Sequence, residues 1–268
     1  MIKLKFAISG KGGVGKTTIA AALSRMLASY GYTVYAVDAD PDANLGMALG
    51  FPPEEVDQIA PIAELKELII ERTGGVGPYF VLNPRVDDIL EKFVVVREGI
   101  KLMRMGMVKK AASECYCREN TFLRAVIQGL LLERDEVVIM DMTAGIEHLT
   151  RGTAMYVDGM LIVTEPTAAS MRTALTACAL AHELGIKEVA IVGNKVRNDE
   201  EANAIASFVE AECSKLKRQV QLLCFIPFDV NIWGQAITGV PPLDEVDASP
   251  FWSAIRCICD WLISIAKN

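Results

Sequence analysis

The residues best suited to chemistry form a glycine-rich segment near the start of the sequence. The pattern G-x-x-x-x-G-K-[ST] is matched at every fixed position by Gly10-Lys11-Gly12-Gly13-Val14-Gly15-Lys16-Thr17. Glycines let the backbone N–H groups of such a loop surround phosphate oxygens, and the start of the following helix adds positive partial charge. The segment therefore predicts a phosphate-binding loop. The residues that we expect to contact the nucleotide here are Gly12, Gly13, Val14, Gly15, Lys16, Thr17 and Thr18.

The same segment also fits a dinucleotide-binding pattern. Its glycines match G-x-G-x-x-G, and Asp38 stands near the distance at which a ribose-binding acid would be expected. Lys16 and Thr17 decide between the two, because a lysine can reach terminal phosphates and a hydroxyl can ligate Mg²⁺. A dinucleotide site has no use for this pair. We therefore predict a nucleoside triphosphate with Mg²⁺, held in part by Thr17.

Carboxylates follow two apolar segments that we expect to be strands. Asp38-Ala39-Asp40-Pro41-Asp42 follows one of them, and Asp141 ends the other. A carboxylate near the γ-phosphate can orient a water molecule for in-line attack, and one at the end of a buried strand can hold Mg²⁺, usually through water. We assign the magnesium role to Asp141 and expect the backbone N–H of Gly145 to approach the γ-phosphate. For Asp38 the alternative to a role at the phosphates is a structural one. For Asp42 the alternative is a solvated turn residue.

Two cysteine pairs have the same one-residue spacing. Cys115-Tyr116-Cys117 is expected in a loop before a helix, where two thiolates can bind one metal ion but supply only half of a four-sulfur set. A two-fold dimer would complete the set, and two ordinary loop thiols are the alternative. Cys257-Ile258-Cys259 falls in a predicted helix over 251–266, where residues two apart point about 200° away from each other and cannot share one ion. We expect packing roles for Cys178, Cys213, Cys224, Cys257 and Cys259.

Composition limits the classes of protein that the sequence can encode. The chain has 268 residues, of which 51% are hydrophobic and 23% charged, so a large core is expected. A net charge of -7 without a basic run argues against nucleic acid and anionic membranes as partners. Seven cysteines, an odd number, and no signal-peptide pattern predict a cytoplasmic protein with free or metal-binding thiols.

Alternating apolar runs and helical patterns must position these residues. This alternation predicts an α/β fold, with a mostly parallel central sheet and helices on both faces. We expect a single domain over residues 1–268, with an irregular insertion around 51–117 that carries the cysteine pair. Helical spacing is expected between the first two strands, over 167–184 and from Phe251 on. The expected strands are Lys3–Ser9, Thr33–Val37, Glu136–Asp141, Gly159–Thr164, Val189–Gly193 and Val220–Phe225.

Lys11 and the stretch from Gly12 to Thr18 resemble the deviant Walker A motif of the MinD, ParA and nitrogenase iron-protein superfamily of P-loop NTPases. The resemblance implies an ATP-hydrolysing homodimer in which Lys11 reaches the nucleotide of the other subunit. It also implies that Lys16 contacts the phosphates and that Asp40, in the first switch, orients the attacking water.

The resemblance extends to the base pocket. Asn194 and Lys195 resemble its base-contacting turn, and Pro227 stands in a segment that resembles the second base-pocket turn. A guanine-reading turn would have aspartate where Arg197 stands, so adenine is favoured. ATP and ADP are therefore the expected nucleotides.

Taken together, the loop, the Asp38–Asp42 segment, the CxC with the following Arg118-Glu119-Asn120, and the segment Asp141–Gly152 resemble the CooC family, ATPases accessory to carbon monoxide dehydrogenase. That resemblance implies a metallochaperone that helps to insert nickel into the metal cluster of carbon monoxide dehydrogenase or of acetyl-CoA synthase, with Ni²⁺ or Zn²⁺ on Cys115 and Cys117. A partitioning or positioning ATPase like MinD or ParA, and an iron–sulfur electron donor like the nitrogenase iron protein, are the alternatives. His148 is expected to be a hydrogen-bonding group rather than a ligand.

Overall fold

A computed structural model of the chain describes residues 3–75, 81–86, 88–106, 117–130, 136–144, 157–216, 220–235 and 249–267. The predicted site residues Cys115 and Gly145 lie outside these ranges, as does His148.

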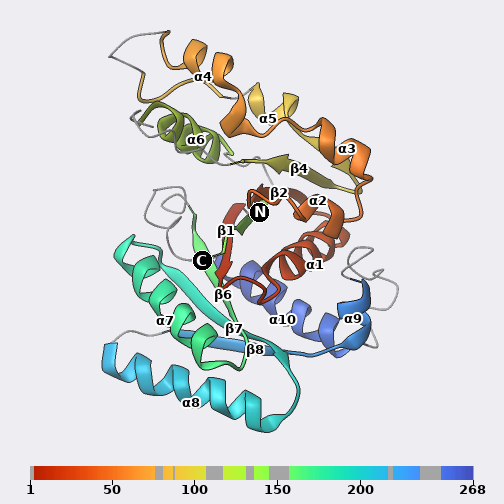
Figure 1. Cartoon of the computed structure of the whole chain (residues 1–268), viewed down its shortest axis with the longest axis vertical. Helices are drawn as coiled ribbons and strands as arrows, with labels where there is room; N and C mark the ends of the chain where they lie inside the picture. The colour runs from red at the N-terminus through yellow and green to blue at the C-terminus, as the bar shows by residue number, and fades with distance from the viewer. Residues whose placement is uncertain are drawn as a thin grey trace.

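A twisted sheet forms the centre of the described structure (Figure 1). Its strand order is β3-β4-β2-β5-β1-β6-β7-β8, with every neighbouring pair parallel except the antiparallel pair of β3 and β4. Parallel strands buried on both faces consist of continuous apolar runs, and the strands at the centre of this sheet do. The strands are β1 (Lys3–Gly10), β2 (Thr33–Ala39), β3 (Val95–Arg97), β4 (Ile100–Arg104), β5 (Glu136–Met142), β6 (Gly159–Thr164), β7 (Glu188–Val196) and β8 (Gln221–Pro227).

Helices cover both faces of this sheet, as predicted. One core contains residues of α1 and α10, and the other contains residues of α6, α7 and α8. Neighbouring residues of β1 point to opposite cores: Phe6 packs edge-to-face against Trp261 of α10, whereas Ala7 faces the second core. The helices are α1 (Lys16–Ser29), α2 (Leu45–Ala48), α3 (Pro53–Gln58), the 3-10 turn η1 (Ile62–Glu64), α4 (Lys66–Arg72), α5 (Ile89–Lys92), α6 (Cys117–Gly129), α7 (Ala168–Glu183), α8 (Asp199–Leu216), α9 (Val230–Gln235) and α10 (Pro250–Ile265).

The sequence predicts β1, β2, β5, β6, β7 and β8 to within a few residues, and it predicts α1, α7 and α10, but it does not predict α8. β6 has the expected bounds, and α7 begins after its N-cap Thr167, whose hydroxyl accepts a hydrogen bond from the backbone N–H of Ser170 at 3.3 Å. The same helix ends at Glu183, just before Gly185, which has a φ of 80° and terminates it as expected.

The segment 51–117 is more regular than its sequence suggests. It holds several short helices, and it also supplies β4, which extends the main sheet by pairing in parallel with β2. The interpretation of this segment as an insertion in a single domain over 1–268 stays a prediction.

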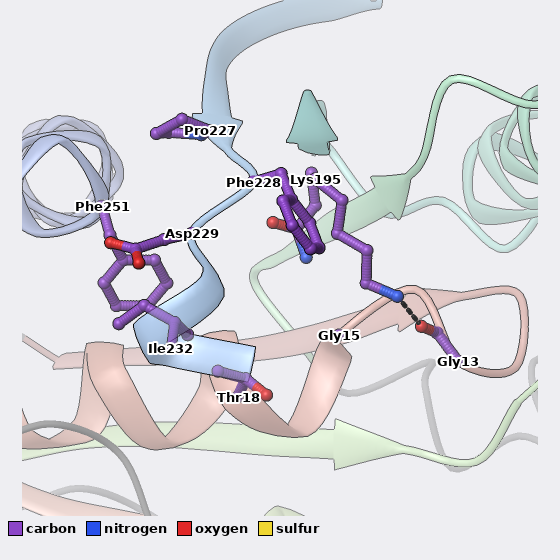
Figure 2. A pocket seen from close by; sticks show the side chains of 10 residues that line it. Gly13, Gly15, Thr18, Lys195, Pro227, Phe228, Asp229, Ile232 and Phe251 are labelled. Atoms are coloured by element: carbon purple, nitrogen blue, oxygen red, sulfur yellow. Dashed lines mark hydrogen bonds between the residues drawn. The ribbon is translucent and has the colours of Figure 1, made fainter. Parts of the chain in front are cut away.

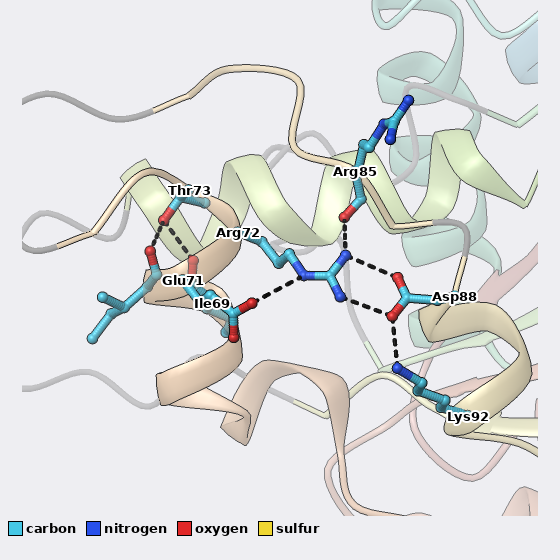
Figure 3. Close-up of polar contacts among 8 residues, drawn as sticks. Ile69, Glu71, Arg72, Thr73, Arg85, Asp88 and Lys92 are labelled. Carbon is cyan, nitrogen blue, oxygen red and sulfur yellow. Dashed lines mark hydrogen bonds and ion pairs between the residues drawn. The ribbon is translucent and has the colours of Figure 1, made fainter.

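A cluster of charges ties two short helices of this segment together (Figure 3). Two guanidinium nitrogens of Arg72 in α4 donate to the two carboxylate oxygens of Asp88, each at 2.8 Å, and Lys92 of α5 donates to Asp88 at 2.9 Å. Arg72 also donates to the carbonyl oxygen of Arg85 at 3.2 Å. The hydrogen bonds from Arg72 and Lys92 hold the pKa of Asp88 well below its usual range. Because α4 and α5 both contact α6, this cluster supports the helix that begins at Cys117.

Among the described parts of the chain, no helix is both long and apolar enough to cross a lipid bilayer.

Candidate nucleotide site

The loop predicted to bind phosphate runs from the end of β1 to the start of α1. Gly10 and Gly15 both have positive φ angles, 147° and 95°, in the region that favours glycine. A Cβ atom on Gly10 would collide with the carbonyl oxygen of Val163, and one on Gly15 would collide with the side-chain amide of Asn194. The loop therefore needs glycine at both positions to lie against its neighbours.

Lys16 lies in the first turn of α1 with its side chain folded back over the loop. Its ammonium donates to the carbonyl oxygen of Lys11 at 3.3 Å, and only 7% of the residue is exposed. Burial lowers the pKa of Lys16, and the nearby carboxylates of Asp141 and Asp40 oppose that shift. A buried ammonium at this position is suited to bind phosphate oxygens. Their negative charge would stabilise the ammonium in addition to the two carboxylates. The side chain of Lys11 is partly exposed.

Asp38 and Asp141 stand side by side at the ends of β2 and β5. They are partners in the parallel register, and both are buried. Asp38 accepts hydrogen bonds from the backbone N–H of Asp40 at 3.1 Å and of Leu45 at 2.9 Å. Burial nevertheless raises the pKa of Asp38 to about 6. Asp38 therefore anchors the turn that carries Asp40, which agrees with the structural role considered for it.

Asp141 has fewer hydrogen-bond partners than Asp38 or Asp40. It is 1% exposed, and neither carboxylate oxygen has a hydrogen-bond partner of good geometry. Burial raises its pKa to about 7, although the hydroxyl of Thr17 lies close enough to oppose the shift. Buried oxygens without partners, next to a hydroxyl, are the donor set that Mg²⁺ prefers. The residues present therefore fit the predicted magnesium site.

The turn after β2 holds Asp40 near this group. The carboxylate of Asp40 accepts a hydrogen bond from the backbone N–H of Asp42 at 3.1 Å, and Ala43 adopts a left-handed conformation with a φ of 48°. The hydroxyl of Thr143, just after β5, donates to the carbonyl oxygen of Ala39 at 2.9 Å and so ties the two strand ends together. Asp42 is exposed, as expected for a solvated turn residue.

A pocket beside the loop has the composition of a base-binding site (Figure 2). The predicted residues Gly13, Gly15, Thr18, Asn194, Lys195 and Pro227 all line it. Four further residues line the pocket without having been predicted as site residues: Phe228, Asp229, Ile232 and Phe251. Phe228 and Asp229 directly follow Pro227 in the turn that was identified, whereas Ile232 and Phe251 belong to α9 and α10 and follow no motif.

Asn194 and Lys195 bind the loop itself. The side-chain amide of Asn194 donates to the carbonyl oxygen of Val14 at 2.7 Å, and the ammonium of Lys195 donates to that of Gly13 at 2.5 Å (Figure 2). Lys195 also forms an ion pair with Glu165 at 3.6 Å. The end of β7 thus fixes the position of the phosphate-binding loop as well as lining the pocket, a role that the motif alone did not indicate.

A buried lysine connects the strand before the loop to α6. The ammonium of Lys5 in β1 donates to the carbonyl oxygens of Ile127 at 2.9 Å and Gln128 at 3.2 Å, near the C-terminus of α6. A cation at this end of a helix satisfies carbonyls that have no partner within the helix. Nothing in the sequence signalled this contact. It joins the nucleotide-binding strand to the helix that begins at Cys117.

The predicted metal site lies only partly within the described residues. Within the described ranges, no cluster of three or more His, Cys, Asp or Glu side chains could hold a metal ion. Cys117 is the first residue of α6, and Cys115 lies outside the described ranges.

Comparison with known proteins identifies the class of protein that this fold and loop define. Residues 5–243 match the family described as the CobQ/CobB/MinD/ParA nucleotide binding domain. The chain belongs to this family, and it is an ATPase with a P-loop.

Individual relatives can be compared with this chain by sequence identity and by the share of each chain that is covered. It is 44% identical to the carbon monoxide dehydrogenase accessory protein CooC of Rhodospirillum rubrum, over 90% of each chain. It is 40% identical to an uncharacterized ATP-binding protein of Methanocaldococcus jannaschii, over 89% of this chain and 90% of the other. Among solved structures, MinD of Pyrococcus horikoshii in complex with Mg-ADP superposes with a TM-score of 0.69 at 21% identity, covering 99% of this chain and 98% of the other. That likeness supports the fold.

Proposed function

We propose that this chain is an ATP-driven metallochaperone that works as a homodimer and assists nickel insertion into carbon monoxide dehydrogenase or acetyl-CoA synthase. The observation that carries the proposal is the 44% identity to CooC over 90% of each chain, together with the CxC of Cys115 and Cys117. The chain's acidic balance is compatible with protein and metal partners rather than nucleic acid or membrane.

The proposed hydrolysis uses residues that the fold brings to one edge of the sheet. The P-loop backbone and Lys16 bind and orient the phosphates, and Thr17 and Asp141 are the residues that would hold Mg²⁺. Mg²⁺ would neutralise charge that develops on the phosphate oxygens. Asp40 orients the attacking water, and Asp38 positions Asp40 through the hydrogen bond from the Asp40 backbone N–H.

Lys11 has the role that requires a second subunit. We propose that its ammonium contacts the nucleotide bound to the partner, so that ATP is fully enclosed only in the dimer. Its backbone carbonyl remains inside its own loop, where it accepts the hydrogen bond from Lys16. Dimerisation and hydrolysis are then coupled.

The cargo is proposed to bind to Cys115 and Cys117 of both subunits, which together provide four sulfur ligands. Cys117 is the first residue of α6. The contacts of Lys5 with the other end of α6 offer a route by which the nucleotide state reaches this pair.

The test is metal content per dimer, measured after loading with Ni²⁺ or Zn²⁺ and removal of excess metal. We expect one ion per dimer in the native protein and none in the double variant Cys115→Ser, Cys117→Ser. Cys257→Ser with Cys259→Ala is the matched control, because it removes a pair of the same spacing within α10. Unchanged metal content in the first double variant would remove the proposal.

An iron–sulfur role is the second candidate, because a protein of Pyrococcus horikoshii named iron-sulfur cluster carrier protein is 29% identical over 89% of this chain. A four-cysteine set shared between subunits could also hold such a cluster. Protein purified without oxygen would then be brown and absorb visible light. We expect a colourless protein that binds nickel.

A further inference from the structure

Two cysteines outside the proposed metal site lie against each other. Cys224 is in β8 and Cys257 is in α10, two elements that pack against each other, and the two thiols are close enough to interact. The thiol of Cys224 also lies 3.8 Å from the carbonyl oxygen of Ala254, which it donates to, one helical turn before Cys257. Both cysteines are free thiols. The sequence alone predicts packing roles for both, because its spacing pairs Cys257 only with Cys259.

The two thiols differ in their access to solvent. Cys257 is exposed, Cys224 is partly buried, and Cys259 on the same helix is buried among core residues. Burial raises the pKa of Cys224 to about 12, so its thiol is a poor nucleophile in the resting protein. A dissolved oxidant would therefore meet Cys257 first, and Cys224 stands where a second thiol must be to complete a disulfide.

The two elements that carry this pair also lead into the base pocket. β8 ends at Pro227, which lines the pocket together with the two residues that follow it. α10 begins at Pro250, and the next residue, Phe251, lines the same pocket. A bond between Cys224 and Cys257 would close a loop over residues 224–257. This loop contains the lining residues that follow β7 in the chain, namely Pro227, Phe228, Asp229, Ile232 and Phe251.

We propose that Cys224 and Cys257 form a reversible disulfide that weakens nucleotide binding. The oxidant is a small disulfide such as oxidised glutathione. The Cys257 thiolate attacks one of its sulfurs, its S–S bond breaks, and one thiolate leaves. Cys224 then loses its proton to solvent and attacks the Cys257 sulfur, which releases the second thiolate. Two electrons pass from the cysteines to the oxidant, and the leaving thiolates take up the two protons.

The effect on the pocket follows from the geometry of a disulfide. A disulfide fixes the separation of its two sulfurs and restricts its torsion angle, so it would hold β8 and α10 at one separation at this point. We expect the two elements, and the pocket wall that they carry, to shift when the bond forms. We expect ATP to bind about tenfold more weakly to the oxidised protein, which is the effect of losing about one hydrogen bond to the nucleotide.

The first experiment asks whether the bond forms. Reduced protein is treated with oxidised glutathione, remaining thiols are alkylated, and peptides are mapped by mass. We expect a cross-link between the peptides of Cys224 and Cys257, reversed by dithiothreitol, present in Cys259→Ala and absent in Cys257→Ser. Alkylation of both cysteines after oxidation, or a cross-link that joins Cys257 to another cysteine, would overturn the proposal.

The second experiment measures the dissociation constant of a fluorescent ATP analogue in the double variant Cys115→Ser, Cys117→Ser, which excludes oxidation of the proposed metal pair. We expect about tenfold weaker binding after oxidation and recovery after reduction. The further substitution Cys257→Ser, at an exposed position, should abolish the response. Equal affinity of the oxidised and reduced forms would overturn the regulatory role.

Discussion

Asp38 and Asp141 face each other in register on the parallel strands β2 and β5, and both carboxylates are buried at the edge where the P-loop lies. Burial raises the pKa of each, to about 6 and about 7 respectively, and the charge of Asp38 raises the pKa of Asp141 further. The nucleotide-free site therefore holds an unfavourable concentration of negative charge. Bound Mg²⁺ would reduce this repulsion, so the two buried carboxylates favour binding of the metal–nucleotide complex.

The first prediction concerns Asp141. A raised folded-state pKa means that the folded chain binds the proton more tightly, so this carboxyl lowers the free energy of unfolding as pH rises from about 4 to about 7. Asp141→Asn removes that loss and should stabilise the nucleotide-free protein at pH 8 by on the order of 2–4 kcal/mol. Its Mg²⁺-dependent ATPase activity should be lost. Denaturant unfolding across pH measures the first effect, and an unchanged pH slope would contradict the burial argument.

The second prediction concerns the loop glycines. Gly15→Ala places a methyl group against the amide of Asn194 and forces alanine to a φ of 95°, so it should destabilise the nucleotide-free protein by roughly 1–3 kcal/mol. Gly12→Ala is the matched control, because its Cβ would meet Ala144 at an ordinary 3.5 Å. Thermal unfolding of the two variants compares them. Equal melting temperatures would show that Asn194 does not constrain the loop.

The third prediction separates the two lysines of the loop. Lys11→Ala should abolish ATP hydrolysis and leave most nucleotide binding intact, because its ammonium is proposed to act on the partner's nucleotide. Lys16→Ala should weaken binding itself, since this buried ammonium faces its own loop. Equilibrium binding and steady-state hydrolysis on both variants provide the comparison. Retained turnover in Lys11→Ala would argue against the role across the dimer.

The fourth prediction concerns Lys5. Lys5→Met removes the hydrogen bonds to the carbonyls of Ile127 and Gln128, so amide hydrogen exchange in the last turn of α6 should accelerate by about tenfold. Lys3→Met, two residues earlier on the same strand and exposed, is the control and should leave that exchange unchanged. If α6 exchanged at the same rate in all three proteins, Lys5 would not support this helix.

The sequence predicts the parts of this molecule that depend on local patterns. Continuous apolar runs marked the central strands, and the spacing of Gly15, Lys16 and Thr17 marked the loop, because phosphate binding requires those residue types in that order. Contacts between segments far apart in the chain had no such signature. Lys5 on α6, Asn194 on the loop carbonyls, Phe251 in the pocket and the Cys224 contact all depend on how the elements pack, which only the fold determines.

The most direct test of the proposed function is activation of nickel-free carbon monoxide dehydrogenase in an extract that lacks this chain. Purified protein, Ni²⁺ at limiting concentration and ATP are added, and carbon monoxide oxidation is measured. We predict activation by the native chain that requires ATP and is lost in both Lys11→Ala and the double variant Cys115→Ser, Cys117→Ser. Equal activation by the double variant, or by Ni²⁺ without the protein, would contradict the account.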